Sequence, residues 1–128
     1  MLSQHSFKSL VLSRIVFNYS KSTAPHLSDS KHVAEQRGRY NARRAHLAPA
    51  LIAAGFTIDH SEAGLYIWAT RNESSWDSVA WLAALGILAT PGVFYGQAGE
   101  NHIRIALTAT DQQIATAAER ILAKVSAP

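Results

Sequence analysis

The sequence predicts an α+β fold, in which a small sheet carries helices packed on one of its faces. Apolar residues follow a helical spacing, then a strand-like one, and this change repeats along the chain. The resulting order is helix, two strands, helix, two strands, helix. The length of 128 residues, with 48% hydrophobic and 16% charged residues, fits one globular domain with a modest core.

A long helix is predicted over residues 30–54. Apolar residues spaced by sevens and fours would share one face of it: Val33, Tyr40, Leu47 and Leu51. Ser30 can cap its start and Gly55 can end it. Pro49 lies inside the pattern, so we expect a kink or a split near His46.

Four strands are predicted, over residues 56–60, 65–70, 87–90 and 102–108. The second of these, over residues 65–70, shows the clearest alternation. One face would be formed by Leu65, Ile67 and Ala69, and the opposite face by Tyr66, Trp68 and Thr70. Pro91 and Gly92 should end the third strand.

Two further helices complete the predicted order. Ser74 or Ser75 can cap a helix that runs through Leu85 and ends at Gly86. Its expected buried residues are Val79, Leu82 and Leu85. Thr110 should cap the last helix, since Gln113 follows at the spacing of a capping box. Its expected buried residues are Ile114, Ala118, Ile121 and Val125.

Residues 1–28 differ in composition from the rest of the chain. They contain Lys8, Arg14 and Lys21, many serines and no acidic residue. Such a composition is typical of a transit peptide, but the cleavage and targeting signals are weak. We therefore expect an unrelated or disordered leader over residues 1–28 and a folded domain over residues 29–128.

Composition excludes several classes of protein. The absence of cysteine rules out a disulfide framework, thiolate catalysis and cysteine-rich zinc sites, and it fits a reducing, cytoplasmic compartment. The net charge of +3 is too small to predict nucleic-acid binding by itself. The longest apolar run, residues 79–89, is too short for a membrane span.

Several candidate motifs do not assemble into a site. The six histidines show no metal-ligand spacing, so no metal site is predicted. Asp59, His60 and Ser61 have the residue types of a catalytic triad, but neighbours on a strand point to opposite faces. The polar side of the long helix carries Arg37, Arg39, Arg43 and Arg44. We interpret these arginines as a solvated face, with a stripe for RNA or phosphate as the alternative.

Arg104 is the one charged residue in the apolar strand 102–108, and it follows a glycine-spaced loop with Phe94 and Tyr95. A charged side chain in such a strand usually has a partner, and guanidinium offers a planar fork of donors that fits a carboxylate. One interpretation is a carboxylate-binding arginine. The other is an exposed arginine that extends into water. No catalytic residue is assigned.

Together these segments resemble the C-terminal small domain of a class I/II aminotransferase, a fold-type I enzyme that uses pyridoxal phosphate. The resemblance runs from about residue 31 to residue 125. The block HVAEQRGRYNARRAHLAPALIAAGF is similar to the family's long helix leading into the small domain. SEAGLYIWAT resembles its Gly-Gly-aromatic-aromatic-Trp strand, with Ala63 where many members have the first glycine. GILATPGVFYGQAGENHIRIALT resembles the strand, loop and strand that end in the substrate-binding arginine.

The resemblance implies that Arg104 pairs with the carboxylate of an amino-acid or 2-oxo-acid substrate during amino-group transfer. Within the family, HSEAGLYIWAT and PGVFYGQAG look closest to succinyldiaminopimelate transaminase of lysine biosynthesis. The family's Schiff-base lysine and phosphate-cradling residues lie in a large domain, and Lys8 and Lys21 sit in no matching motif. No cofactor-binding residue is therefore expected in this chain.

These implications predict a fragment, or the product of a disrupted reading frame, without a complete active site. Its partner would be the missing large domain or a second copy in a homodimer, with no nucleic acid and no membrane. The alternative is a non-catalytic α+β module that binds a small carboxylate. A domain without its partner should expose apolar surface, which we expect at Tyr40, Leu47 and Leu51 and at Val93, Phe94 and Tyr95.

Overall fold

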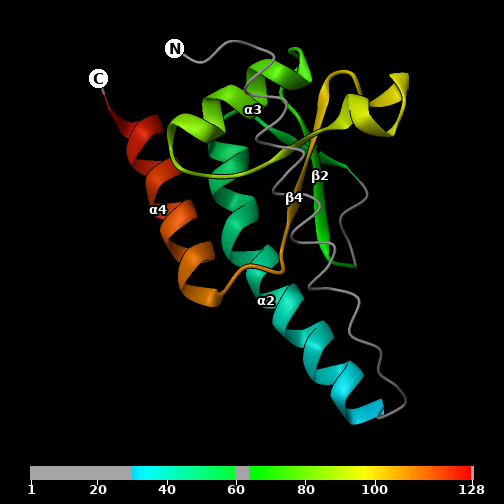
Figure 1. Ribbon diagram of the computed structural model, residues 1–128. Helices are drawn as coiled ribbons and strands as arrows, with labels where there is room; N and C mark the ends of the chain where they lie inside the picture. Colours follow the sequence, from blue (N-terminus) through cyan, green and yellow to red (C-terminus); the bar gives the residue numbers. More distant parts are fainter. Residues whose placement is uncertain (1–29, 60–63, 128) are drawn as a thin grey trace.

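The computed structural model describes residues 30–59 and 64–127 (Figure 1). In chain order the elements are α2 (Ser30–Ala53), β1 (Thr57–Asp59), β2 (Tyr66–Thr70), α3 (Ser75–Ala84), β3 (Thr90–Pro91), the 3-10 turns η1 (Gly92–Tyr95) and η2 (Gln97–Gly99), β4 (His102–Ala106) and α4 (Asp111–Ser126). The expected leader over residues 1–28 lies outside the described residues, and the domain boundary after it stays a prediction.

The described strands form one antiparallel sheet in the order β1-β2-β4-β3. Figure 1 shows α2, α3 and α4 together on one side of this sheet. The α+β fold class predicted from the sequence, a small sheet with helices on one face, is confirmed.

The core lies between the sheet and the helices, and it depends on the alternation of β2 and β4. The inward side chains of these strands are at most 4% exposed: Ile67, Ala69, Ile103 and Ile105. The helices contribute Leu47, Leu51, Leu82 and Ile121, none of which is more than 1% exposed. The expectation that Leu47 and Leu51 form an open surface for a partner is therefore wrong, because both side chains are needed to cover the sheet.

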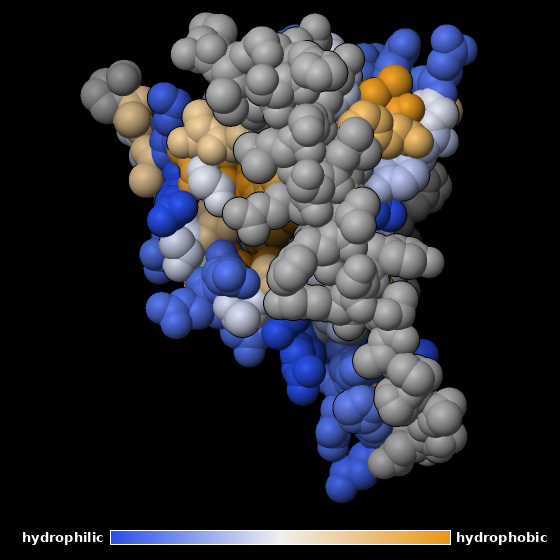
Figure 2. All heavy atoms as spheres, in the orientation of Figure 1, coloured by the Kyte–Doolittle hydropathy of each residue, from blue (hydrophilic) through white to orange (hydrophobic). Residues whose placement is uncertain are grey.

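Val33 and Val125 differ from the prediction that each belongs to a buried helix face. Their side chains are exposed, since Val33 lies in the first turns of α2 and Val125 in the last turn of α4. Figure 1 shows that the beginning of α2 extends past the other elements, and Figure 2 shows a hydrophilic surface there. Periodicity in the sequence identifies the apolar face of a helix. It does not show which turns of that helix the sheet covers.

Two further local predictions need correction. Helix α2 is not split at Pro49 but continues through it to Ala53. The strand expected over residues 87–90 is reduced to Thr90–Pro91. The reason lies in the end of α3, where the amide of Ile87 donates to the carbonyl of Leu82 and Gly86 adopts a positive φ of 78°. This helix-ending motif uses backbone groups that a strand would need.

The start of α4 matches the predicted capping box. The Gln113 amide donates to Thr110 Oγ1 over 3.1 Å, and the Thr110 amide donates to Gln113 Oε1 over 3.0 Å. We expect Thr110→Ala to lower the free energy of unfolding by about 1 kcal/mol, because one helix-end donor loses its acceptor. Urea melts measure this loss. Thr108→Ala, at an exposed turn, is the control and should change stability by less than about 0.5 kcal/mol.

Candidate carboxylate-binding site

The sheet surface turned away from the helices is rich in aromatic side chains. Four of the outward residues of β2 and β4, together with one loop residue, form a set that we call the aromatic face: Tyr66, Trp68, His102, Arg104 and Tyr95. The strand register places Trp68 directly opposite Arg104, so their side chains leave the sheet on the same side. The sequence predicted this alternation, but it did not show that Tyr95 joins the face.

Arg104 contacts two tyrosine rings on the aromatic face. The guanidinium carbon is 3.8 Å from the centre of the Tyr66 ring and 4.5 Å from that of Tyr95. Both distances are within the range of attractive cation–π contact. Among residues 30–59 and 64–127, no carboxylate pairs with this guanidinium, whereas Arg43 and Arg71 each have one. The side chain is half-buried against the rings and keeps access to solvent.

The loop that carries Tyr95 is held against Trp68 by two glycines. Gly92 and Gly99 are buried and their backbones lie against each other. A β-carbon on Gly92 would come within 2.8 Å of Trp68 Cη2, and one on Gly99 within 2.9 Å of the same atom. These glycines are therefore required for close approach of the loop to the indole. Tyr95 then meets Trp68 edge-on, with ring centres 6.2 Å apart.

His102 and Asp59 form a second polar contact on this side of the sheet. His102 Nε2 lies 2.9 Å from Asp59 Oδ2, and the imidazole stacks on Trp68 with ring centres 4.9 Å apart and planes 11° from parallel. The other ring nitrogen, Nδ1, is buried and has no hydrogen-bond partner among the described residues. From the sequence, Asp59 was compared only with its neighbours in the chain. Its partner in the structure, His102, lies on β4, which is distant in the sequence.

The arginines of α2 do not form a uniform basic stripe. Arg43 donates to Asp111 Oδ1 and to the carbonyl of Leu107, and it thereby ties α2 to the start of α4. Arg44 donates to Asn41 Oδ1 and to the carbonyl of Gly64. Arg37 and Arg39, in contrast, are exposed. Two of the four arginines thus have structural partners within the domain.

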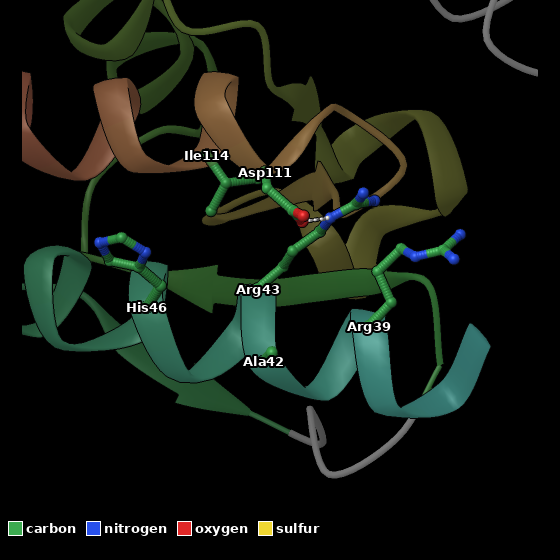
Figure 3. A pocket seen from close by; sticks show the side chains of 6 residues that line it. All are labelled: Arg39, Ala42, Arg43, His46, Asp111 and Ile114. Atoms are coloured by element: carbon green, nitrogen blue, oxygen red, sulfur yellow. Dashed lines mark hydrogen bonds and ion pairs between the residues drawn. The ribbon is translucent and has the colours of Figure 1, made fainter. Parts of the chain in front are cut away.

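A shallow pocket of about 200 Å³ lies between α2 and α4. It is lined by Arg39, Ala42, Arg43, His46, Asp111 and Ile114. Figure 3 shows the Arg43–Asp111 ion pair across it, with Arg39 and His46 at opposite ends and pointing apart. Arg43 is already neutralised by Asp111, and the side chains of Arg39 and His46 do not converge. This pocket is therefore a poorer candidate for binding an anion than the surface around Arg104.

The described part of the chain contains neither a metal-binding cluster nor a membrane-spanning helix. Residues 30–59 and 64–127 contain no cluster of three or more histidine, aspartate or glutamate side chains that could hold a metal ion. Among the described helices, none has the length and apolar character needed to cross a membrane.

Comparisons with known proteins identify the family of this chain. A family model described as aminotransferase class I and II matches residues 6–121. The chain is 57% identical over 95 residues to the 4-dedimethylamino-4-oxo-anhydrotetracycline transaminase OxyQ of Streptomyces rimosus, covering 74% of this chain and 26% of that protein. It is 33% identical over 111 residues to the LL-diaminopimelate aminotransferase of Natranaerobius thermophilus, covering 83% of this chain and 29% of that enzyme.

A solved structure with a similar fold is also an aminotransferase. An aromatic aminotransferase from Pyrococcus horikoshii superimposes with a TM-score of 0.65 at 24% identity, over 74% of this chain and 26% of that one. The present chain thus spans about a quarter of the length of the proteins it matches. Because the family model covers most of the sequence, the chain belongs to the class I and II aminotransferase family.

Proposed function

We propose that this chain provides the substrate-carboxylate site of an aminotransferase, with Arg104 as the residue that binds the carboxylate of an amino acid or 2-oxo acid. The observation that carries this proposal is the contact of the guanidinium with Tyr66 and Tyr95, without a carboxylate partner among the described residues. Membership of the family supports it, since aminotransferases act on amino and 2-oxo acids.

The aromatic contacts suit this role because of how guanidinium binds. When a guanidinium stacks on an aromatic ring, the ring contacts its flat face, while the N–H donors lie in the plane and remain free at the edge. A carboxylate can accept two parallel hydrogen bonds from that edge. Tyr66 and Tyr95 therefore restrict the orientation of Arg104 without competing for its donors.

Enzymes of this family use pyridoxal phosphate, which a lysine holds as a Schiff base. The lysines of the described chain are Lys31, in the first turn of α2, and Lys124, in the last turn of α4. Both are exposed on helices, and neither belongs to the aromatic face. The described residues do not fit the cofactor, and we assign no chemical step to them. A large domain would supply that part of the site.

For the substrate we propose a diaminopimelate derivative, with succinyldiaminopimelate as the specific candidate and lysine biosynthesis as the setting. Support comes from the residue patterns HSEAGLYIWAT and PGVFYGQAG and from the Natranaerobius thermophilus relative, an LL-diaminopimelate aminotransferase. The Streptomyces rimosus relative, a transaminase named for a tetracycline intermediate, is the competing precedent. A non-catalytic module that binds a small carboxylate remains the second candidate, because both described lysines are exposed on helices and neither belongs to the aromatic face.

Binding can be tested on the full chain by NMR, with ¹⁵N-labelled arginine side chains and titration with diaminopimelate. We expect saturable shifts of the Arg104 guanidinium signals. Arg104→Lys should weaken binding by about 1 kcal/mol, because lysine keeps the charge but loses the planar fork at a partly solvated site. Cadaverine, a diamine without a carboxylate, should leave the Arg104 signals in place.

Arg37→Lys is the matched control, since Arg37 is an exposed arginine on α2. It should leave the affinity unchanged. If Arg104→Lys binds diaminopimelate as tightly as the unmodified chain does, Arg104 is not the carboxylate-binding residue. The thermal melt of each variant, recorded on the same samples, separates loss of the site from loss of the fold.

A further inference from the structure

We propose that Asp59 and His102 are positioning residues for Arg104, acting through Trp68 and Tyr95. This inference rests on the proposed function of Arg104 and adds two residues to its site. Neither residue touches the guanidinium in the structure. Their effect passes along a series of contacts, each of which is short and defined.

The first contact spans the sheet. Asp59 is on β1 and His102 is on β4, and β2 runs between these two strands. The bond between Asp59 Oδ2 and His102 Nε2, 2.9 Å long, therefore bridges two strands that are not neighbours. It fixes the imidazole in the orientation that stacks on Trp68, with the two planes only 11° apart.

The second contact fixes the indole. With His102 against one side, Trp68 Cη2 lies against the closely packed backbones of Gly92 and Gly99. The indole is thus held between the imidazole and the loop that contains η1 and η2. A change in its tilt would move the surface on which this loop rests, because packed groups with no free space move together.

The third contact reaches the guanidinium. Tyr95 belongs to η1, meets Trp68 edge-on at 6.2 Å and places its ring 4.5 Å from the Arg104 guanidinium carbon. Tyr95 is 49% exposed, and Trp68 and Arg104 are the two groups that its ring contacts in these pairs. The position of this ring, and with it one wall of the carboxylate site, depends on Trp68.

The same pair contributes little to overall stability. The side chains of Asp59 and His102 are 37% and 20% exposed, and polar contacts that are partly open to solvent add little to stability. Removing the contact should therefore leave the domain folded. A positioning role and a structural role can therefore be told apart. Loss of a positioning residue changes the environment of Arg104, whereas loss of a structural residue changes only the melting behaviour of the domain.

The test uses the full chain and three variants: Asp59→Ala, which removes the oxygen that meets His102 Nε2, His102→Phe and the double variant. His102→Phe keeps a flat ring that can stack on Trp68 but removes the nitrogen that meets Asp59. The first measurement is the chemical shift of the Arg104 side chain without ligand, which reports the ring currents of Tyr66 and Tyr95. The second is the affinity for diaminopimelate. Asp77→Asn, an exposed aspartate in the first turn of α3, is the control.

We expect each single variant to shift the Arg104 signals and to weaken binding about three- to ten-fold, with an unchanged melt. The double variant should be no worse than either single one, since both remove the same contact. Unchanged Arg104 signals in Asp59→Ala and His102→Phe would overturn the inference, as would additive effects in the double variant. Displaced Arg104 signals in a chain that binds no diaminopimelate would support the positioning role and refute the proposed function.

Discussion

Leu51→Ala should destabilise the domain by about 2–5 kcal/mol, the range for emptying a large buried aliphatic site. Leu51 is 0% exposed and belongs to the part of α2 that covers the sheet. For a domain whose total stability is about 5–15 kcal/mol, such a loss brings it close to unfolding. Urea melts followed by circular dichroism measure the change directly.

Ile52 provides a matched control for this prediction. It is the next residue on the same helix, but its side chain is 59% exposed. Ile52→Ala should therefore change the free energy of unfolding by less than about 0.5 kcal/mol. Equal melts for the two variants would mean that Leu51 faces a partner, as the sequence alone had led us to expect, and not the core.

Gly99→Ala should displace the loop that carries Tyr95, at a cost of about 1–3 kcal/mol or more. The added methyl would overlap the carbonyl of Gly92 and come within 2.9 Å of Trp68 Cη2, and neither the backbone nor the buried edge of the indole can yield easily. The Trp68 indole N–H and the Arg104 side-chain signals in NMR spectra should both move. Carboxylate binding should weaken with them.

Gly38→Ala should have the opposite effect and raise the free energy of unfolding. Gly38 is inside α2, and nothing lies within 4 Å of the position its β-carbon would take. Alanine there should stabilise the helix by about 0.5–1 kcal/mol. If Gly99→Ala instead melts like the unmodified chain and keeps the Trp68 and Arg104 signals in place, the loop does not depend on the contact between the two glycines.

Features set by neighbouring residues were predictable from the sequence. The Thr110–Gln113 capping box needs only two residues at a fixed spacing, and the structure confirms both of its hydrogen bonds. The alternation of β2 was equally clear, because Ile67 and Ala69 are two residues apart, which is the period of a strand, and Trp68 between them belongs to the other face. In each case the deciding interaction lies within a few residues along the chain.

Features set by register and by packing were not predictable in this way. The contact of Arg104 with Tyr66 depends on how β2 pairs with β4, and the contact with Tyr95 depends on the path of a glycine-rich loop. The pairing of Asp59 with His102 crosses an intervening strand. The sequence could identify Arg104 as an unusual charge in a strand, but it could not show what surrounds it.

The two edge strands of the sheet limit how copies of the domain can associate. In the described part of the chain, the edge strands are β1, with three residues, and β3, with two, one of which is Pro91. Short edges and proline offer few free backbone groups on which a further strand could form. The longer strands β2 and β4 are enclosed between them. Copies of this domain at high concentration should therefore resist fibril-like strand addition, and any assembly should depend on contacts between side chains.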